Sequence, residues 1–356
     1  SLPSFAQLVP QWRSQMGLPL YSGGNPRGMV LDDSSNVYLL DNVVNFGDAR
    51  TDCIDPVLHK LNKNGETIWI RNFGAVPCWQ EDARCLKMDN ENNLLALCQT
   101  ADTLNNIILT YVVKANRNGD ILWKTNLGNA INFFDSKLEI SSSGFIYVSI
   151  KNTDFNSNYE NKIFKISSSG LKTDSIKVSH NGTPVFIYDF KILSDTKIYI
   201  LYYTSSDSTY ISLVDTGSNV QWTSKSPYFL CSKIGKDSSI IAANAERMSK
   251  FNINGELKWT KLLYGSNPGS FNGNSIEPKI LLTRDDNIIY AGCAPITAQT
   301  HTFLVSKLNS QTGDSIWSFK LNSTLPSNSM LTDIAMDSSG NFYACGLILP
   351  TNYQNG

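Results

Sequence analysis

The stretch PVLHKLNKNGETIWIRNFGAVPCWQEDARCLKMDNENNLLAL, residues 56 to 97, decides the fold of this chain. Its first two apolar segments are joined by an Asn-Gly turn, and the second segment carries Trp69. A loop, a third segment that ends at Asp89, a polar turn and a fourth apolar segment follow. Gly, Asn and Asp tolerate the backbone conformations of tight hairpin turns. The stretch therefore predicts consecutive antiparallel hairpins.

The same pattern of four strands, which we name A to D, recurs along the whole chain. It is complete six times between Met29 and Phe319. Before these repeats lies one D-like strand, Val9 to Gln15, which contains Trp12. After them lies one A–B hairpin between Leu331 and Leu349. The two chain ends therefore each carry part of one more repeat.

A circular array that shares its terminal strands removes exposed sheet edges. We expect an all-β chain with one domain, residues 1–356, folded as a seven-bladed β-propeller. Residues 1–15 would form the strand that closes the last blade, and residues 350–356 a C-terminal tail. The last blade lacks a plausible C strand, so three alternatives stay open. It has three strands, recruits residues 1 to 8, or accepts a strand from another molecule by edge addition.

Two segments resemble a known repeat. The first contains Lys60-Leu61-Asn62, Asn64-Gly65, Trp69 and Asp89, and the second contains Lys307-Leu308, Gly313, Trp317 and residues 337 to 346, DSSGNFYACG. Both are similar to the bacterial β-propeller repeats known as SBBP repeats. The likeness covers most of the chain and is weakest in the fourth repeat. It implies an extracytoplasmic protein, periplasmic, secreted or on the cell surface, with a binding or structural role and no catalytic residues.

The composition excludes several classes of function. Apolar residues make up 41% and charged residues 17% of the chain, which is typical of a globular protein. The formal net charge of −1 argues against a nucleic-acid partner. No apolar run approaches the roughly 18 residues that span a membrane, so we expect no membrane insertion. The first residue is Ser1, which fits removal of a signal peptide or trimming of the chain.

Seven cysteines leave at least one thiol without a partner inside the chain. Cys53 and Cys78 lie in loops that the repeat places on one face of a blade. Cys85 and Cys98 fall nearly opposite one another across a hairpin. A disulfide is one expectation for each pair, and buried thiols in a β core are the other.

The recurring tryptophans and acidic turns have structural explanations. One large ring at the same position of each D strand is what packing between blades requires. The turns that begin at Asp32, Asp89 and Asp337 lack the Gly and Glu of calcium loops, so we expect hairpin chemistry. The three histidines are too scattered for a metal centre. With no nucleophile elbow, phosphate loop or Cys-x-x-Cys pair, we expect no cofactor and no metal.

The longest and most varied loops are the D–A and B–C loops, and a ring would bring them together at the mouth of its central channel. Variable loops on a rigid frame commonly carry function. Aromatic and charged residues there suit a protein or glycan contact. Alternatively, the acids only solvate the channel and the rings cover the blade tops. The candidate binding residues are Tyr21, Arg27, Trp79, Asp82, Phe134, Asp135, Tyr188, Asp189 and Tyr228.

The favoured function is a non-enzymatic β-propeller that acts as a protein–protein interaction module, an accessory subunit of a cell-envelope or surface assembly. One alternative is a glycan-binding propeller. Another is a propeller hydrolase or lyase that uses a metal ion held by Asp82, Asp135 and Asp189. A last one is an architectural role in which the incomplete blade accepts a strand from a neighbour.

Overall fold

The structure is a computed structural model of the whole chain. It describes residues 25–44, 54–74, 80–102, 107–130, 136–153, 159–204, 208–263, 277–295, 301–320 and 328–349. These residues divide into two compact units. The N-terminal unit ends at Lys225 and the C-terminal unit begins at Ser226. The single domain expected from the sequence stays a prediction.

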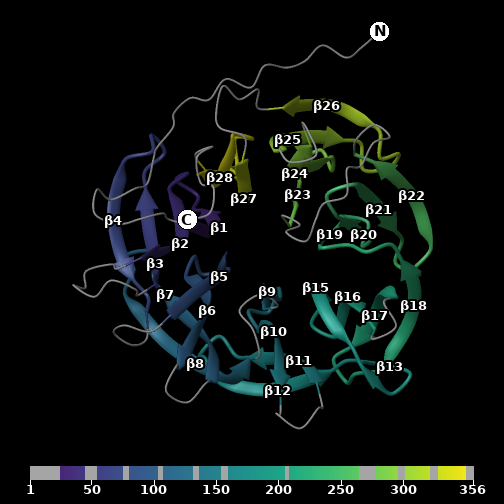
Figure 1. Ribbon diagram of the computed structural model, residues 1–356, viewed down its shortest axis with the longest axis horizontal. Coiled ribbons are helices and arrows are strands. Elements are labelled where there is room, and N and C mark those ends of the chain that lie inside the picture. Colours follow the sequence, from purple (N-terminus) through teal and green to yellow (C-terminus); the bar gives the residue numbers. More distant parts are fainter. Residues whose placement is uncertain are drawn as a thin grey trace, which may run out of the picture. The chain divides into compact units, whose positions relative to one another are not determined.

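The N-terminal unit contains four antiparallel groups of four strands, here called blades, and one short ribbon. A parallel pair, Ile54 with Gln80, joins the first two blades into one sheet. Figure 1 shows its D strands on the outer side of an arc and its A strands on the inner side. In chain order the strands are β1 (Asn25–Leu31), β2 (Val37–Val44), β3 (Ile54–Leu61), β4 (Thr67–Asn72), β5 (Gln80–Met88), β6 (Leu94–Asp102), β7 (Ile107–Ala115), β8 (Ile121–Ala130), β9 (Lys137–Ile140), β10 (Ile146–Thr153), β11 (Tyr159–Ile166), β12 (Lys172–Lys177), β13 (Ser179–His180), β14 (Thr183–Pro184), β15 (Phe186–Ser194), β16 (Lys197–Tyr203), β17 (Thr209–Asp215) and β18 (Val220–Ser226).

The C-terminal unit contains two more four-stranded blades and a hairpin. A single parallel pair, His301 with Asn328, joins the second of these blades to the hairpin. The strands are β19 (Cys231–Ile234), β20 (Ile240–Ala243), β21 (Arg247–Phe251), β22 (Leu257–Leu262), β23 (Lys279–Leu282), β24 (Ile288–Pro295), β25 (His301–Leu308), β26 (Ser315–Lys320), β27 (Asn328–Met336) and β28 (Phe342–Leu349).

The blade count corrects the sequence prediction. The described part of the chain has six four-stranded blades rather than seven. The expected seventh consists there of β27 and β28 alone, because no C or D strand pairs with β28 among the described residues. The closing strand predicted within residues 1–15 and the tail at 350–356 lie outside the described residues.

The acidic turns confirm the hairpin interpretation. The Oδ1 atom of Asp337 accepts hydrogen bonds from the backbone N–H groups of Ser339 and Asn341, at 2.9 and 2.8 Å. Asp32 and Asp89 accept the equivalent pairs of bonds in their own turns. These carboxylates therefore accept hydrogen bonds from backbone N–H groups of the turn that have no partner in the paired strands.

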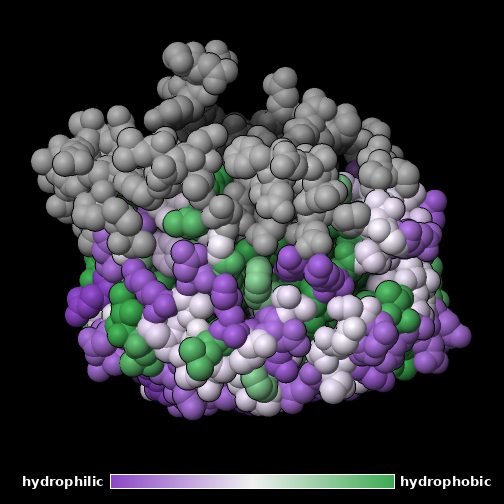
Figure 2. All heavy atoms as spheres, turned by 90° about the horizontal axis from the view of Figure 1, so that it is seen from below, coloured by the Kyte–Doolittle hydropathy of each residue, from purple (hydrophilic) through white to green (hydrophobic). Residues whose placement is uncertain are grey.

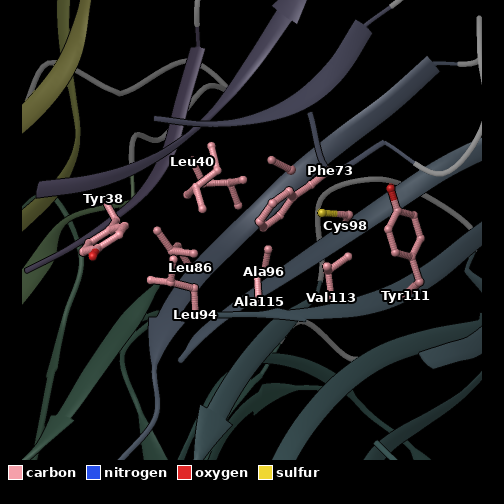
Figure 3. Packing of buried hydrophobic residues seen from close by; sticks show 12 residues of the cluster. Tyr38, Leu40, Phe73, Leu86, Leu94, Ala96, Cys98, Tyr111, Val113 and Ala115 are labelled. Atoms are coloured by element: carbon pink, nitrogen blue, oxygen red, sulfur yellow. The ribbon is translucent and has the colours of Figure 1, made fainter. Parts of the chain in front are cut away.

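Hydrophobic clusters lie between successive blades. Figure 3 shows the cluster between the first two blades, in which Leu40 faces Leu86 and Ala96. Trp69 packs against this cluster, and Trp123, Trp259 and Trp317 pack into the equivalent ones. The packing role predicted for these tryptophans is confirmed. Trp12 lies outside the described residues.

The disulfide considered for Cys85 and Cys98 is wrong, because both thiols are free. Cys98 pairs in register with Ala83, whereas Cys85 pairs with Leu97, and Arg84 bulges out between them. Cys98 therefore lies in the cluster of Figure 3, while Cys85 packs against the next cluster, on the other face of the sheet. Two thiols on opposite faces cannot form a bridge. Cys53 and Cys78 lie outside the described residues.

A recurring polar joint also connects neighbouring blades. The Lys114 Nζ atom on β7 and the Trp123 Nε1 atom on β8 both donate to the Ser168 carbonyl oxygen, at 3.3 and 3.1 Å. Ser168 is the second residue of the turn between β11 and β12, in the following blade. We call such a pair of donors a Lys–Trp clamp. Each clamp ties one blade to the C–D turn of the next.

The second clamp belongs to the C-terminal unit. Lys250 on β21 and Trp259 on β22 both donate to the Ser310 carbonyl oxygen, each at 3.2 Å. Ser310 is again the second residue of the following C–D turn, which connects β25 and β26. In both clamps the acceptor is a backbone carbonyl oxygen, so the clamp holds the backbone of the turn rather than a side chain.

Candidate functional site

Bulges in the A strands organise the candidate site. In β5, Ala83 and Cys85 pair with consecutive residues of β6, so Arg84 has no partner in the ladder. The same irregularity leaves out Arg27 in β1 and Tyr188 in β15. An extra residue turns a side chain out of the normal alternation and often lies beside a functional site. Two of the residues predicted from the sequence, Arg27 and Tyr188, therefore occupy these special positions.

Asp82 is the centre of the first polar group. Its carboxylate pairs with Arg84 at 2.5 Å and with Arg27 at 3.7 Å, and it accepts a hydrogen bond from Asn42. The Arg84 Nε atom donates to the Gln99 side-chain oxygen at 3.0 Å. The carboxylate therefore has two cationic neighbours and one amide donor in a partly buried setting.

Lys191 is the centre of the second polar group. Its Nζ atom lies 2.5 Å from a Glu139 oxygen and 2.8 Å from an Asp189 oxygen. Burial lowers the pKa of Lys191, but the charges and hydrogen bonds of Asp189 and Glu139 outweigh it, so the pKa is raised above its usual value. Lys87 adds a second cation, 3.4 Å from Glu139. This group links the A strands β5, β9 and β15.

Three stacked rings lie in the same blade as Lys191. Tyr188 stacks on Tyr203, with ring centroids 4.8 Å apart, and Tyr203 stacks on Phe186 at 4.5 Å. All three side chains are half-buried. The bulge sets Tyr188 apart from the regular alternation of β15, so one ring of the stack can contact a ligand while the others support it.

The predicted site is only partly described. Asp82 and Arg27 form one group, and Tyr188 and Asp189 lie next to one another in β15. Tyr228 is exposed and belongs to the C-terminal unit. The remaining candidates, Tyr21, Trp79, Phe134 and Asp135, lie outside the described residues.

Sequence reasoning missed the basic half of the site, Arg84 and Lys191. Each stands two positions after a predicted carboxylate, Asp82 and Asp189, on the same A strand. The repeated pattern Asp-x-Arg or Asp-x-Lys was the available signal. This pattern predicts carboxylates that form ion pairs with a basic side chain rather than carboxylates that serve as metal ligands.

Among the residues that the structure describes, no three His, Cys, Asp or Glu side chains gather in a way that could hold a metal ion. Asp82 and Asp189, two of the three ligands considered for a catalytic cation, each pair with a basic side chain. The third, Asp135, is not described. In the described part, no helix is long and apolar enough to cross a membrane.

Comparisons with known proteins find similarity in structure only. No family model and no curated protein matches the chain. The Dos1 propeller superimposes with a TM-score of 0.54 and 10% identity, over 90% of this chain and 89% of that one. The fold is that of a β-propeller. A protein of unknown function from Bacteroides caccae matches with a TM-score of 0.40 and 10% identity, over 85% of this chain and 84% of that one. An unknown-function protein from Dyadobacter fermentans matches with a TM-score of 0.46 and 12% identity, over 83% and 94%.

Proposed function

We propose that this β-propeller is a non-enzymatic interaction module that binds a protein partner through the A-strand bulges of its N-terminal unit. The stack of Phe186, Tyr203 and Tyr188 carries the proposal. Rigid aromatic rings provide contact area at a small cost in side-chain entropy, and they are enriched in binding hot spots. The neighbouring ion pair of Asp189 and Lys191 is largely buried, so its role is to stabilise the strand that carries Tyr188.

The side of the molecule in Figure 2 has a mixed polarity. Figure 2 shows hydrophilic and hydrophobic residues interspersed on the side in view. A partner of strongly opposite charge is therefore not required. The resemblance of the segments around Trp69 and Trp317 to SBBP repeats supports an extracytoplasmic setting, in an assembly at the cell envelope or surface.

A capture experiment tests the proposal. The immobilised chain is incubated with solubilised cell-envelope proteins, and the partner is identified and then titrated as a purified protein. Tyr188→Ala should weaken binding at least tenfold and leave the unfolding temperature unchanged within about 2 °C, because the ring is only half-buried. Tyr210→Ala is the matched control, since Tyr210 stacks instead on His180. Equal binding by wild type and Tyr188→Ala would exclude this site.

A glycan is the second candidate ligand, favoured by the same three stacked rings. Sugars pack their C–H faces on aromatic rings, and the three stacked rings are half-buried rather than fully covered. A glycan array separates the two candidates. Binding of a defined oligosaccharide that is lost in Tyr188→Ala and retained in Tyr210→Ala would replace the protein partner by a sugar.

A further inference from the structure

The last four-stranded blade carries a Lys–Trp clamp that holds no turn in the described structure. Lys307 on β25 and Trp317 on β26 are cross-strand partners, as Lys114 and Trp123 are in their blade. Lys307 keeps the ion pair with its own A–B turn, 3.0 Å from Asp285. Among the described residues, however, neither Lys307 nor Trp317 donates to a backbone carbonyl, because the hairpin of β27 and β28 contributes no C–D turn.

A hollow of about 300 Å³ takes the place of the absent turn. We call it the open socket. On one side it is lined by Lys307, Trp317 and Asp285, and on the other by the turn from Asp337 to Gly340 and by Phe342. The side chain of Lys307 is 22% exposed, whereas those of Lys114 and Lys250 in the filled clamps are 5% and 4% exposed. This difference in exposed fraction is the part of the lysine side chain that a bound turn covers.

The filled clamps define the chemistry of a suitable occupant. Its second turn residue must offer a free carbonyl oxygen to both donors, as Ser168 and Ser310 do. Its glycine must then pass directly over the tryptophan ring. A Cβ atom on Gly170 would lie 2.8 Å from Trp123, and the residue has a φ of +89°. Both the space and the backbone conformation therefore require glycine.

The hairpin beside the socket offers a matching sheet edge. Among the residues that the structure describes, β27 is the one strand that pairs with β28. A donated hairpin could therefore extend the sheet of β27 and β28 and place its turn in the open socket at the same time.

The N-terminal segment of this chain does not fit as the donor of this turn. In the repeats, glycine stands four residues before Trp69, Trp123, Trp259 and Trp317. The equivalent position before Trp12 is Leu8. A leucine is disfavoured in the left-handed conformation, and its side chain would meet the ring that glycine leaves clear.

We propose that the open socket binds the turn of a β-hairpin from another polypeptide, with the sequence Asn/Ser-x-x-Gly or, as in the turn of Ser310, Asn-x-x-x-Gly. The lysine and tryptophan donors hold the carbonyl oxygen of the second turn residue, and the glycine packs on the ring of Trp317. The donated strands complete the sheet that β27 and β28 begin. This contact belongs to the C-terminal unit and is independent of the aromatic stack at Tyr188, so either proposal can fail without the other.

A hairpin peptide with the sequence of residues 107–125 is the probe, labelled with fluorescein and cyclised through an added terminal disulfide. It contains the turn Asn116 to Gly119, in which the Arg117 carbonyl oxygen accepts a hydrogen bond from Lys60 and Gly119 lies beside the ring of Trp69. Fluorescence anisotropy with the full chain should show saturable binding. Lys307→Met should weaken it at least tenfold, and Lys258→Met, which changes an exposed lysine on β22, should leave it unchanged. A peptide with Gly119→Val should bind at least tenfold more weakly.

Three results would overturn the proposal. The first is equal binding of the two peptides, or equal binding by wild type and Lys307→Met when both unfold at the same temperature. The second is tighter peptide binding by Trp12→Ala than by wild type, which would mean that the N-terminal strand of the same chain fills the socket. The third is self-association in light scattering that Lys307→Met abolishes, which would make a second copy the occupant.

Discussion

His59 should make the stability of the protein depend on pH between neutral and mildly acidic conditions. Its side chain on β3 is only 4% exposed, and neither ring nitrogen has a hydrogen-bond partner in the described structure. Its cross-strand neighbours are Leu39 and Ile70. Burial lowers the pKa of His59 from 6.5 to about 4, because the charged ring would lose its hydration without gaining a partner.

The sign and the size of the effect follow from these two values. The unfolded chain takes up a proton below about pH 6.5, while the folded protein resists protonation until about pH 4. The stabilising contribution is therefore complete above pH 6.5 and is lost as the pH falls towards 4. The difference of 2.5 between the pKa values of the unfolded and the folded state sets an upper limit of about 3.4 kcal/mol. Between pH 7 and pH 5 the expected loss is about 2 kcal/mol.

Urea unfolding of wild type and His59→Leu at pH 7 and pH 5, followed by circular dichroism, measures this contribution. The wild type should lose about 2 kcal/mol more than the variant, which has no titratable ring at this position. The carboxylates of Asp32 and Asp89 do not interfere, because their pKa values are lowered from 3.8 and lie below the window. Equal losses in the two proteins would refute the assignment.

Three further predictions concern other sites. Gly170→Ala should lower the free energy of unfolding, measured by urea titration, by about 2 to 4 kcal/mol, because the new methyl group meets Trp123. Gly144 has a similar φ but open space around it, so Gly144→Ala should lower the free energy of unfolding by only about 1 kcal/mol. Lys191→Met removes the cation that lies between the carboxylates of Asp189 and Glu139 and should cost about 3 to 5 kcal/mol in the same assay, with part of the loss regained at low pH. The thiol of Cys98 is fully buried, and burial raises its pKa. Ellman's reagent should therefore label this thiol only when the chain unfolds. Rapid labelling of Cys98 in the native protein would contradict the packing.

The strands and turns were predictable from the sequence because each hairpin carries its own local signal. Turn residues such as Asp337 and Gly313 mark the breaks, and the tryptophans mark the D strands. The number of complete blades was not predictable, since completing the last one depends on strands far away in the sequence. Local pattern alone does not show whether β28 finds a further partner.

The candidate site was predicted in part for a related reason. Aromatic and acidic residues near strand ends drew attention to Asp82 and Tyr188, but their partners depend on register. One bulge at Arg84 shifts every later side chain of β5 to the other face, which also explains why Cys85 and Cys98 do not meet. Periodicity in a single strand does not reveal such a shift.

The Lys–Trp clamp has a consequence for how this chain can diverge. Both donors bind a carbonyl oxygen, which every amino acid possesses, so the residue at that point is free to vary. Ser168 and Ser310 occupy it in the two clamps, and Arg117 accepts the equivalent bond from Lys60. Residues on the outward-facing positions can therefore be substituted or acquire new contacts while the contacts between neighbouring blades are kept. For the same reason, one blade could be exchanged for another without changes in its neighbours.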